Sequence, residues 1–326
     1  MRKVLKNIGS GLLRSVLQKN YSQGNYKEVF WIIGDGRSGT TWIADLINYR
    51  GTYRKMFEPF HPQLVTGMDI IQPHQYIRPE NSDHPLAPLA ADVFSGKFLN
   101  YRVDSRNRKF HYDGIVIKDI FANLFAKWAT RHHPDIRTVL VIRNPFAVAL
   151  SKARKSDWLW LKDPLLLLSQ PQLFQDHLEQ HQDFIRREAD KKDPLLDQLL
   201  IWAIIHYIPL RQFRPGQLKI LFYEDVYADP ESEISSVFER FSPATRGSGI
   251  RISTRLIDKP TRSAGKDSHI AMGTSPVNAW KNEVDAKTID QGMRILQNFG
   301  LENVYAGDSI AAVSGDELLN LVQSRN

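Results

Sequence analysis

The chain contains no cysteine among its 326 residues. That absence excludes disulfide bonds, thiolate metal sites and a cysteine nucleophile, and it is compatible with a reducing compartment. The chain also has no apolar run of the roughly 18 residues that a membrane-spanning helix requires, no internal repeat and no low-complexity tract. We therefore expect a cytoplasmic protein that does not cross a membrane.

Acidic residues are missing from residues 1–20, which carry five cations. The segment has no unbroken apolar core before a small-residue cleavage site, so we do not interpret it as a secretory signal. A basic amphipathic helix of this kind either makes peripheral contact with an anionic membrane or docks on its own domain. We delimit it as residues 1–27 and treat 28–326 as a single domain. Its apolar face is formed by Val4, Leu5, Ile8, Leu12, Leu13, Val16 and Leu17.

Lysine and arginine number 43 against 36 aspartate and glutamate residues, a net charge of +7. An excess of this size favours an anionic ligand or surface, although a basic surface can also serve solubility alone.

Short runs rich in branched apolar residues predict buried parallel strands, each followed by a helix-like stretch. After the last run, Asp229 is expected to cap a helix that begins at Pro230. This alternation predicts an α/β fold, a P-loop-like parallel sheet flanked by helices, with helical substrate-side insertions. The strands are expected at 29–34, 114–119, 138–143 and 218–225, the insertions at 60–112 and 156–200, and a mobile basic flap at 242–279.

The first strand runs into "GDGRSGTTW", residues 34–42, which predicts a phosphate-binding loop before a helix. The free N–H groups of a helix start attract an anion, and Arg37 adds a fixed positive charge. The ATP-binding loop G-x-x-x-x-G-K-[ST] has a lysine after its last glycine, where this chain has Thr40. The ligand therefore needs a phosphate cradle without the lysine for a terminal phosphate.

A second phosphate-binding motif follows the third strand, in "VIRNPFAVALSKARK". Pro145 starts the helix, so Arg143 stands at the strand end and Ser151 about two turns into the helix. A guanidinium and a hydroxyl so placed can reach one phosphate from two sides. Taken alone, the motif also fits an arginine paired with a carboxylate and a serine on a solvated face.

In this order, "GRSGTTW" and "VIRNPFAVALS" resemble the two phosphate-binding signatures of the PAPS-dependent sulfotransferases, in particular bacterial and carbohydrate-type members. Their donor, 3′-phosphoadenosine 5′-phosphosulfate (PAPS), has no γ-phosphate and needs no metal. The resemblance implies that the loop holds the 5′-phosphosulfate, and that Arg143 and Ser151 hold the 3′-phosphate. Arg262 is the nearest stand-in for a family Arg-Lys-Gly triplet that is missing here. The implied donor-binding set is Arg37, Ser38, Gly39, Thr40, Thr41, Trp42, Arg143, Ser151 and Arg262.

Cytosolic family members follow the second strand with Lys-x-His, the histidine being the base, whereas this chain has Lys118, Asp119 and Ile120. A hydroxyl acceptor still needs a base. "FEPFH", residues 57–61, resembles the segment that carries a catalytic carboxylate in carbohydrate-type members, which makes Glu58 the candidate and His61 the reserve. Apolar neighbours are expected to raise the pKa of Glu58. Lys118 is expected to neutralise charge on the bridging oxygen.

The resemblance implies transfer of a sulfuryl group to a hydroxyl, or less readily an amine, of a small molecule, carbohydrate or lipid, with no nucleic-acid partner. Trp158 and Trp160 could line an acceptor pocket or belong to the core. Two other readings remain open, a P-loop kinase or NTPase with Asp225 on magnesium, and an inactive nucleotide-binding module. His177 and His181 have a zinc-compatible spacing, but the pattern differs from H-E-x-x-H and favours a solvated helix face.

Overall fold

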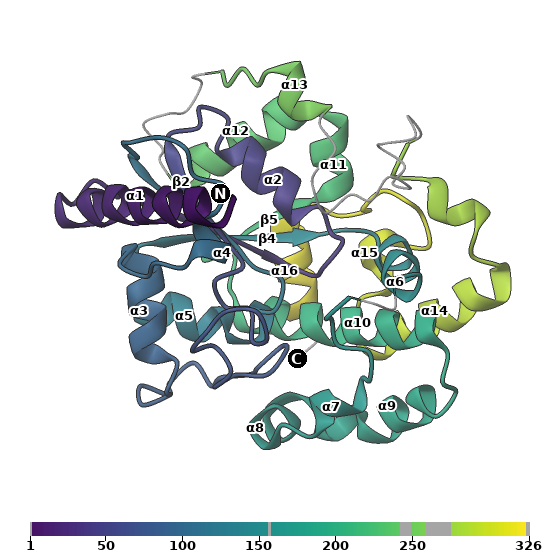
Figure 1. Ribbon diagram of the computed structural model, residues 1–326. Helices are drawn as coiled ribbons and strands as arrows, with labels where there is room; N and C mark the ends of the chain where they lie inside the picture. Colours follow the sequence, from purple (N-terminus) through teal and green to yellow (C-terminus); the bar gives the residue numbers. More distant parts are fainter. Residues whose placement is uncertain (1, 156–157, 242–248, 259–274, 324–326) are drawn as a thin grey trace.

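The computed structural model describes residues 2–155, 158–241, 249–258 and 275–323 (Figure 1). Arg262 and most of the basic flap expected at 242–279 lie outside these residues. The elements are α1 (Arg2–Ser22), β1 (Glu28–Gly34), α2 (Thr40–Ile47), β2 (Tyr53–Phe57), α3 (Ala87–Ser95), α4 (Tyr101–Asp104), β3 (Gly114–Lys118), η1 (Asn123–Phe125), α5 (Ala126–His132), β4 (Ile136–Ile142), α6 (Pro145–Ala153), α7 (Leu165–Leu168), α8 (Pro171–Leu173), η2 (Phe174–Leu178), η3 (Glu179–His181), α9 (Gln182–Ala189), α10 (Pro194–Gln212), β5 (Lys219–Phe222), α11 (Tyr223–Ala228), α12 (Pro230–Phe241), α13 (Thr254–Ile257), η5 (Ala279–Asn282), α14 (Ala286–Asn298), α15 (Glu302–Tyr305) and α16 (Gly315–Gln323).

The strands form one parallel sheet in the order β2-β3-β1-β4-β5, which confirms the predicted α/β architecture. Four strands correspond to the four predicted runs. The last one ends earlier than expected, at Phe222, because the chain turns directly into α11.

The edge strand β2 was missed, because its sequence YRKMF holds two cations and does not form an apolar run. Arg54 is nevertheless fully buried, since its guanidinium donates to both carboxylate oxygens of Asp104 and to the carbonyls of Gly96 and Phe98. These partners satisfy a buried charge that the sequence pattern alone made improbable.

Helices cover both faces of the sheet, as Figure 1 shows with α2 and α12 on one side and α10 on the other. The smaller core lies under α2 and α12 and includes Phe30, Ile43 and Val237. The larger core lies under α6, α10 and α16. Helix α10 is apolar around most of its circumference because it is buried between the sheet and outer helices. Asp193 caps it by accepting from the N–H groups of Leu195 and Leu196.

As predicted, α12 begins at Pro230, and the side chain of Asp229 accepts from the N–H of Ser232. Within the described ranges, no helix combines the length and apolarity needed to cross a bilayer. The loops that follow β1, β2, β3 and β4 meet at the carboxyl edge of the sheet, where open α/β sheets bind their ligands.

Candidate active site

The glycine-rich loop between β1 and α2 has a left-handed backbone conformation at Gly39 that favours glycine. Gly39 has φ of 85°, and a Cβ there would lie 2.4 Å from the Tyr223 ring. No side chain caps the N-terminus of α2, so its first N–H groups face the loop. The hydroxyl of Ser38 is buried and has no hydrogen-bond partner in the described part of the chain. The loop therefore presents donors whose natural complement is an anion.

A buried ion pair fixes the base of this loop. Asp35 accepts from the N–H of Gly36 at 2.7 Å and from the ammonium of Lys152 at 2.9 and 3.0 Å. The Lys152 side chain is fully buried although it belongs to α6. The pair thus joins the first phosphate motif to the second. Sequence analysis missed it, because a lysine in a basic stretch gives no sign of being buried.

Arg37 of the loop contacts both Ser151 and Arg143 of the second motif. Arg37 donates from Nε to the Ser151 hydroxyl at 2.9 Å, and Arg143 donates to the Arg37 carbonyl at 3.0 Å. Arg143 also donates to the Pro276 carbonyl at 2.8 Å and stacks on the Tyr223 ring, 4.3 Å from its centre. Burial, and then repulsion from Arg143, lower the pKa of Arg37 to about 10, so Arg37 remains charged at neutral pH. Two neighbouring half-buried cations favour an anion between them.

Glu58 lies directly after β2, with a left-handed φ of 51°. Its N–H donates to the Lys118 carbonyl at 2.7 Å, which extends the β2–β3 pairing by one residue. The Lys118 ammonium donates to Oε1 of Glu58 at 2.6 Å, and Arg102 donates to Oε2 at 2.8 Å. Such a backbone conformation in a non-glycine residue is typical of functional sites.

Our expectation of a raised pKa for Glu58 is wrong. Burial does raise it, but the combined attraction and hydrogen bonds of Lys118 and Arg102 outweigh burial, and the pKa falls below its ordinary value of 4.5. The sequence pointed to the apolar neighbours of Glu58 and not to its charged ones. Arg102 comes from α4, 44 residues away in the chain, and no local pattern connects it to Glu58.

His61 and Asp119 lie beside this carboxylate. His61 is buried, donates its backbone N–H to the Glu58 carbonyl at 3.2 Å and packs edge-on against Phe121. Burial lowers the pKa of His61 to about 4, so its ring is neutral at pH 7. Asp119 accepts from the Trp31 indole at 2.9 Å and from the Phe60 N–H at 3.2 Å. Asp119 therefore holds the turn that carries both base candidates.

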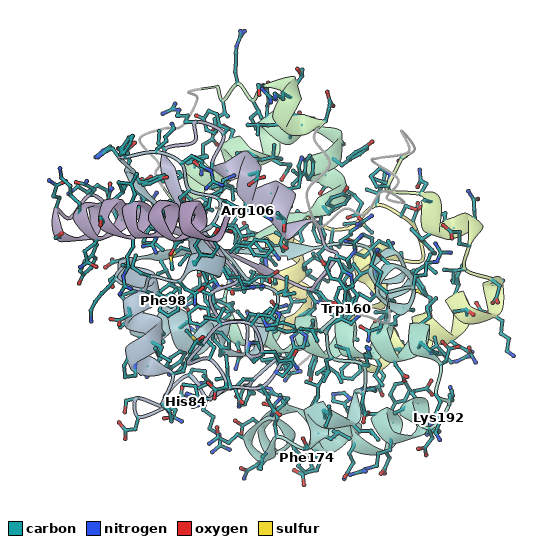
Figure 2. The ribbon with its side chains drawn as sticks, in the orientation of Figure 1. His84, Phe98, Arg106, Trp160, Phe174 and Lys192 are labelled. Carbon is teal, nitrogen blue, oxygen red and sulfur yellow. The ribbon has the colours of Figure 1, made fainter. Side chains whose placement is uncertain are left out.

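Three tryptophans, Trp42, Trp158 and Trp160, lie beside the glycine-rich loop. Trp42 is buried and its indole donates to the carbonyls of Leu256 and Ile257, which attaches α13 to α2. The rings of Trp158 and Trp160 lie 5.0 Å apart. Trp160, labelled in Figure 2 near α6 and α10, packs over Gly36, and Arg37 lies over the Trp158 ring at 5.7 Å. The pair therefore adjoins the phosphate loop.

The two histidines with zinc-compatible spacing have separate partners. The His177 ring lies 3.1 Å from the Tyr76 hydroxyl, whereas His181 is buried against Tyr207 and Phe299. The solvated face expected for them is wrong for His181. Over the ranges that the structure describes, no cluster of three or more histidine and carboxylate side chains could hold a metal.

Comparison with known proteins gives one family and two structural likenesses. The model of the family described as "Sulfotransferase domain" matches residues 27–292. A search of curated proteins finds no match. A sulfotransferase from Alicyclobacillus acidocaldarius has 15% identity and a TM-score of 0.39, covering 85% of this chain and 94% of its own. The sulfotransferase domain from the curacin biosynthetic pathway has 12% identity and a TM-score of 0.43, covering 83% and 96%. Both scores are low, and the family match carries the assignment.

Proposed function

Because the chain belongs to the sulfotransferase domain family, we propose that it transfers a sulfuryl group from PAPS to a hydroxyl acceptor. The observation that carries the choice of donor is the pairing of two phosphate grips. One is the lysine-free loop, in which the Ser38 hydroxyl has no partner among the described residues. The other is formed by the half-buried Arg143 and by Ser151, both of which contact Arg37. A nucleotide with phosphate groups at both its 5′ and 3′ positions requires two such grips.

The residues present fit this donor. Ser38, Thr40, Thr41 and the free N–H groups of α2 would hold the 5′-phosphosulfate, with Arg37 beside them. Arg143 and Ser151 would hold the 3′-phosphate, and the Arg143 Nε is a buried donor without a partner among the described residues. When bound, the donor supplies an activated sulfuryl group joined to phosphate through a bridging oxygen.

Glu58 is the base in this proposal. As the acceptor oxygen forms its bond to sulfur, the bond from sulfur to the bridging oxygen breaks, and Glu58 takes the hydroxyl proton. The charge left on the bridging oxygen is neutralised by Lys118, which already lies 2.6 Å from Glu58. His61 is the second candidate base, because it is neutral and adjoins Glu58.

The acceptor is a small molecule, and we propose a hydroxyl on a carbohydrate or lipid, with an amine as the second option. Peripheral membrane contact through residues 1–20 would bring a lipid acceptor to the site. Leu12 on α1 is 59% exposed in a segment that carries only positive charges, and Figure 1 shows α1 projecting from the domain.

Adenosine 3′,5′-bisphosphate tests the donor assignment directly. Without magnesium it should stabilise the protein by about 2.7 kcal/mol at a hundred times its dissociation constant, and AMP or ATP should stabilise it far less. The measurement is thermal unfolding with each nucleotide, with and without magnesium. A larger shift with magnesium-ATP than with the bisphosphate would favour a kinase and contradict the proposal.

A further inference from the structure

The buried ion pair of Asp35 and Lys152 lies at the base of the phosphate loop and is not among the residues proposed to hold the donor. The exposed fraction of the side chain is 0% for Lys152 and 2% for Asp35. The Lys152 ammonium donates to both carboxylate oxygens of Asp35, at 2.9 and 3.0 Å. Asp35 also accepts from the N–H of Gly36 at 2.7 Å, and its carbonyl accepts from the N–H of Ser38 at 3.3 Å. One lysine of α6 therefore fixes the turn from Asp35 to Ser38.

The surroundings of this pair leave its two charges to each other. His74 and His206 are fully buried within electrostatic range of both charges. Burial lowers the pKa of His74 to about 3 and that of His206 to about 4, so both rings are neutral at pH 7 and do not compete for the carboxylate. The Lys152 ammonium lies 5.9 Å from the centre of the Trp160 ring, which packs over Gly36.

Net stability is a poor explanation for such a pair. The cost of removing two charges from water largely offsets their attraction, so a buried ion pair contributes little to the free energy of unfolding. A buried pair does fix a geometry, because separating its two charges leaves each of them buried without a partner. The geometry fixed here is the position of the phosphate loop relative to α6.

The loop is also joined to the second phosphate motif through residues that would themselves hold the donor. Arg37 donates to the Ser151 hydroxyl, and Arg143 donates to the Arg37 carbonyl. A bound phosphate would compete for these groups and weaken both contacts. The contact between Lys152 and Asp35 uses none of them. It can therefore keep the spacing between the two grips both before and after the donor binds.

We propose that Asp35 and Lys152 are positioning residues, which hold the two phosphate grips at the separation that a nucleotide phosphorylated at both its 5′ and 3′ positions requires. The two phosphates of such a nucleotide can span only a limited distance, so both bind at full strength only if the loop and α6 keep their spacing. A nucleotide with one phosphate uses one grip and depends less on that spacing. This inference rests on the proposed function and adds two residues that select the doubly phosphorylated donor without touching it.

Lys152→Met tests the role of the pair, because methionine keeps an unbranched side chain and removes the charge. Calorimetry measures the affinities for adenosine 3′,5′-bisphosphate, for AMP and for adenosine 3′-monophosphate. The affinity for the bisphosphate should fall by roughly ten- to a hundred-fold, which is within the usual range of coupling between two sites, and the affinity for each monophosphate should fall far less. A merely structural role would not produce this split between ligands.

Asp35→Asn is a milder variant, because its amide oxygen can still accept from the Gly36 N–H after the charge is lost. It should show the same split, and it decides the role of the pair if Lys152→Met does not fold. Arg54→Met and Asp104→Asn are the matched controls, since each also breaks a fully buried ion pair, but one that joins β2 to α4, away from both grips. They should lower the unfolding temperature and leave all three affinities unchanged.

Equal losses for the bisphosphate and the two monophosphates would overturn the inference, as would a bisphosphate affinity that neither substitution in the pair changes. The same split in the control variants would also overturn it, because the split would then reflect general destabilisation. The wild type decides the donor assignment separately. If it binds the bisphosphate no more tightly than AMP, the proposed function fails before any variant is measured, and the inference fails with it.

Discussion

Replacing Glu58 by glutamine tests the proposed chemistry at its most specific point. The change keeps the size of the side chain but leaves one acceptor oxygen for Lys118 and Arg102 together, and it removes the capacity to take a proton. If Glu58 is the base, turnover should fall by about 10² to 10⁴, the usual contribution of a positioned base. Affinity for adenosine 3′,5′-bisphosphate should remain, because the donor grips at Arg143 and Ser151 do not involve Glu58.

The contacts of Glu58 also set the expected pH dependence and stability. Its pKa lies below the ordinary 4.5, so it is ionised throughout the neutral range, and the rate should show no rising limb near pH 7 from this group. A depressed carboxyl pKa stabilises the folded state above the unfolded pKa, and that stability is lost as pH falls through the folded pKa. Breaking a buried ion pair costs about 3 to 5 kcal/mol. Arg102 is 28% exposed, so we expect the lower end of that range.

The assay measures turnover from pH 5 to 9 for the wild type, Glu58→Gln and His61→Ala, with bisphosphate affinity and urea unfolding determined separately. Glu28→Gln is a matched control. Glu28 is also paired, with Arg137 and Tyr53, but it begins β1 and so lies at the amino edge of the sheet, whereas Glu58 lies at the carboxyl edge. Near-normal turnover in Glu58→Gln with collapse in His61→Ala would transfer the role to His61. A rising limb near neutral pH that disappears only in Glu58→Gln would refute the lowered pKa.

Two further predictions concern Arg143 and Asp119. Arg143→Ala should weaken bisphosphate binding by roughly ten- to a hundred-fold while leaving AMP, which lacks the 3′-phosphate, nearly unchanged. Calorimetry measures both ligands, and equal losses would show that Arg143 only supports the Arg37 and Pro276 carbonyls. Burial raises the pKa of Asp119 from 3.8 to about 7, so the folded state retains a proton and the wild type should lose stability as pH rises between these values. Asp119→Asn lacks this titration, so its stability relative to the wild type should increase from pH 5 to 7 in urea unfolding; a constant difference would contradict the raised pKa.

Local patterns predicted the features of this chain that depend on neighbouring residues. The β1 loop, the strand end at Arg143, the start of α6 at Pro145 and the cap at Asp229 each follow from a few adjacent residues. The parallel sheet was also predicted, because buried parallel strands appear in a sequence as unbroken apolar runs. Edge strand β2 was not predicted, since three of its five residues are partly exposed and its buried Arg54 depends on distant partners.

The sequence by itself determined the two phosphate motifs and their order, because spacing along one strand, loop and helix sets those positions. The carboxylate candidate Glu58 came from the resemblance of residues 57–61 to carbohydrate-type sulfotransferases. Only the tertiary structure decided the electrostatics of the site. It paired Lys152 with Asp35 across 117 residues and Arg102 with Glu58 across 44, and so reversed the expected shift of the Glu58 pKa. It also brought Arg102, Arg106 and Lys118 over the ring of Phe57. The physical reason is that a pKa depends on charges a few ångströms away in space, and in a parallel sheet those charges come from loops far apart in the chain.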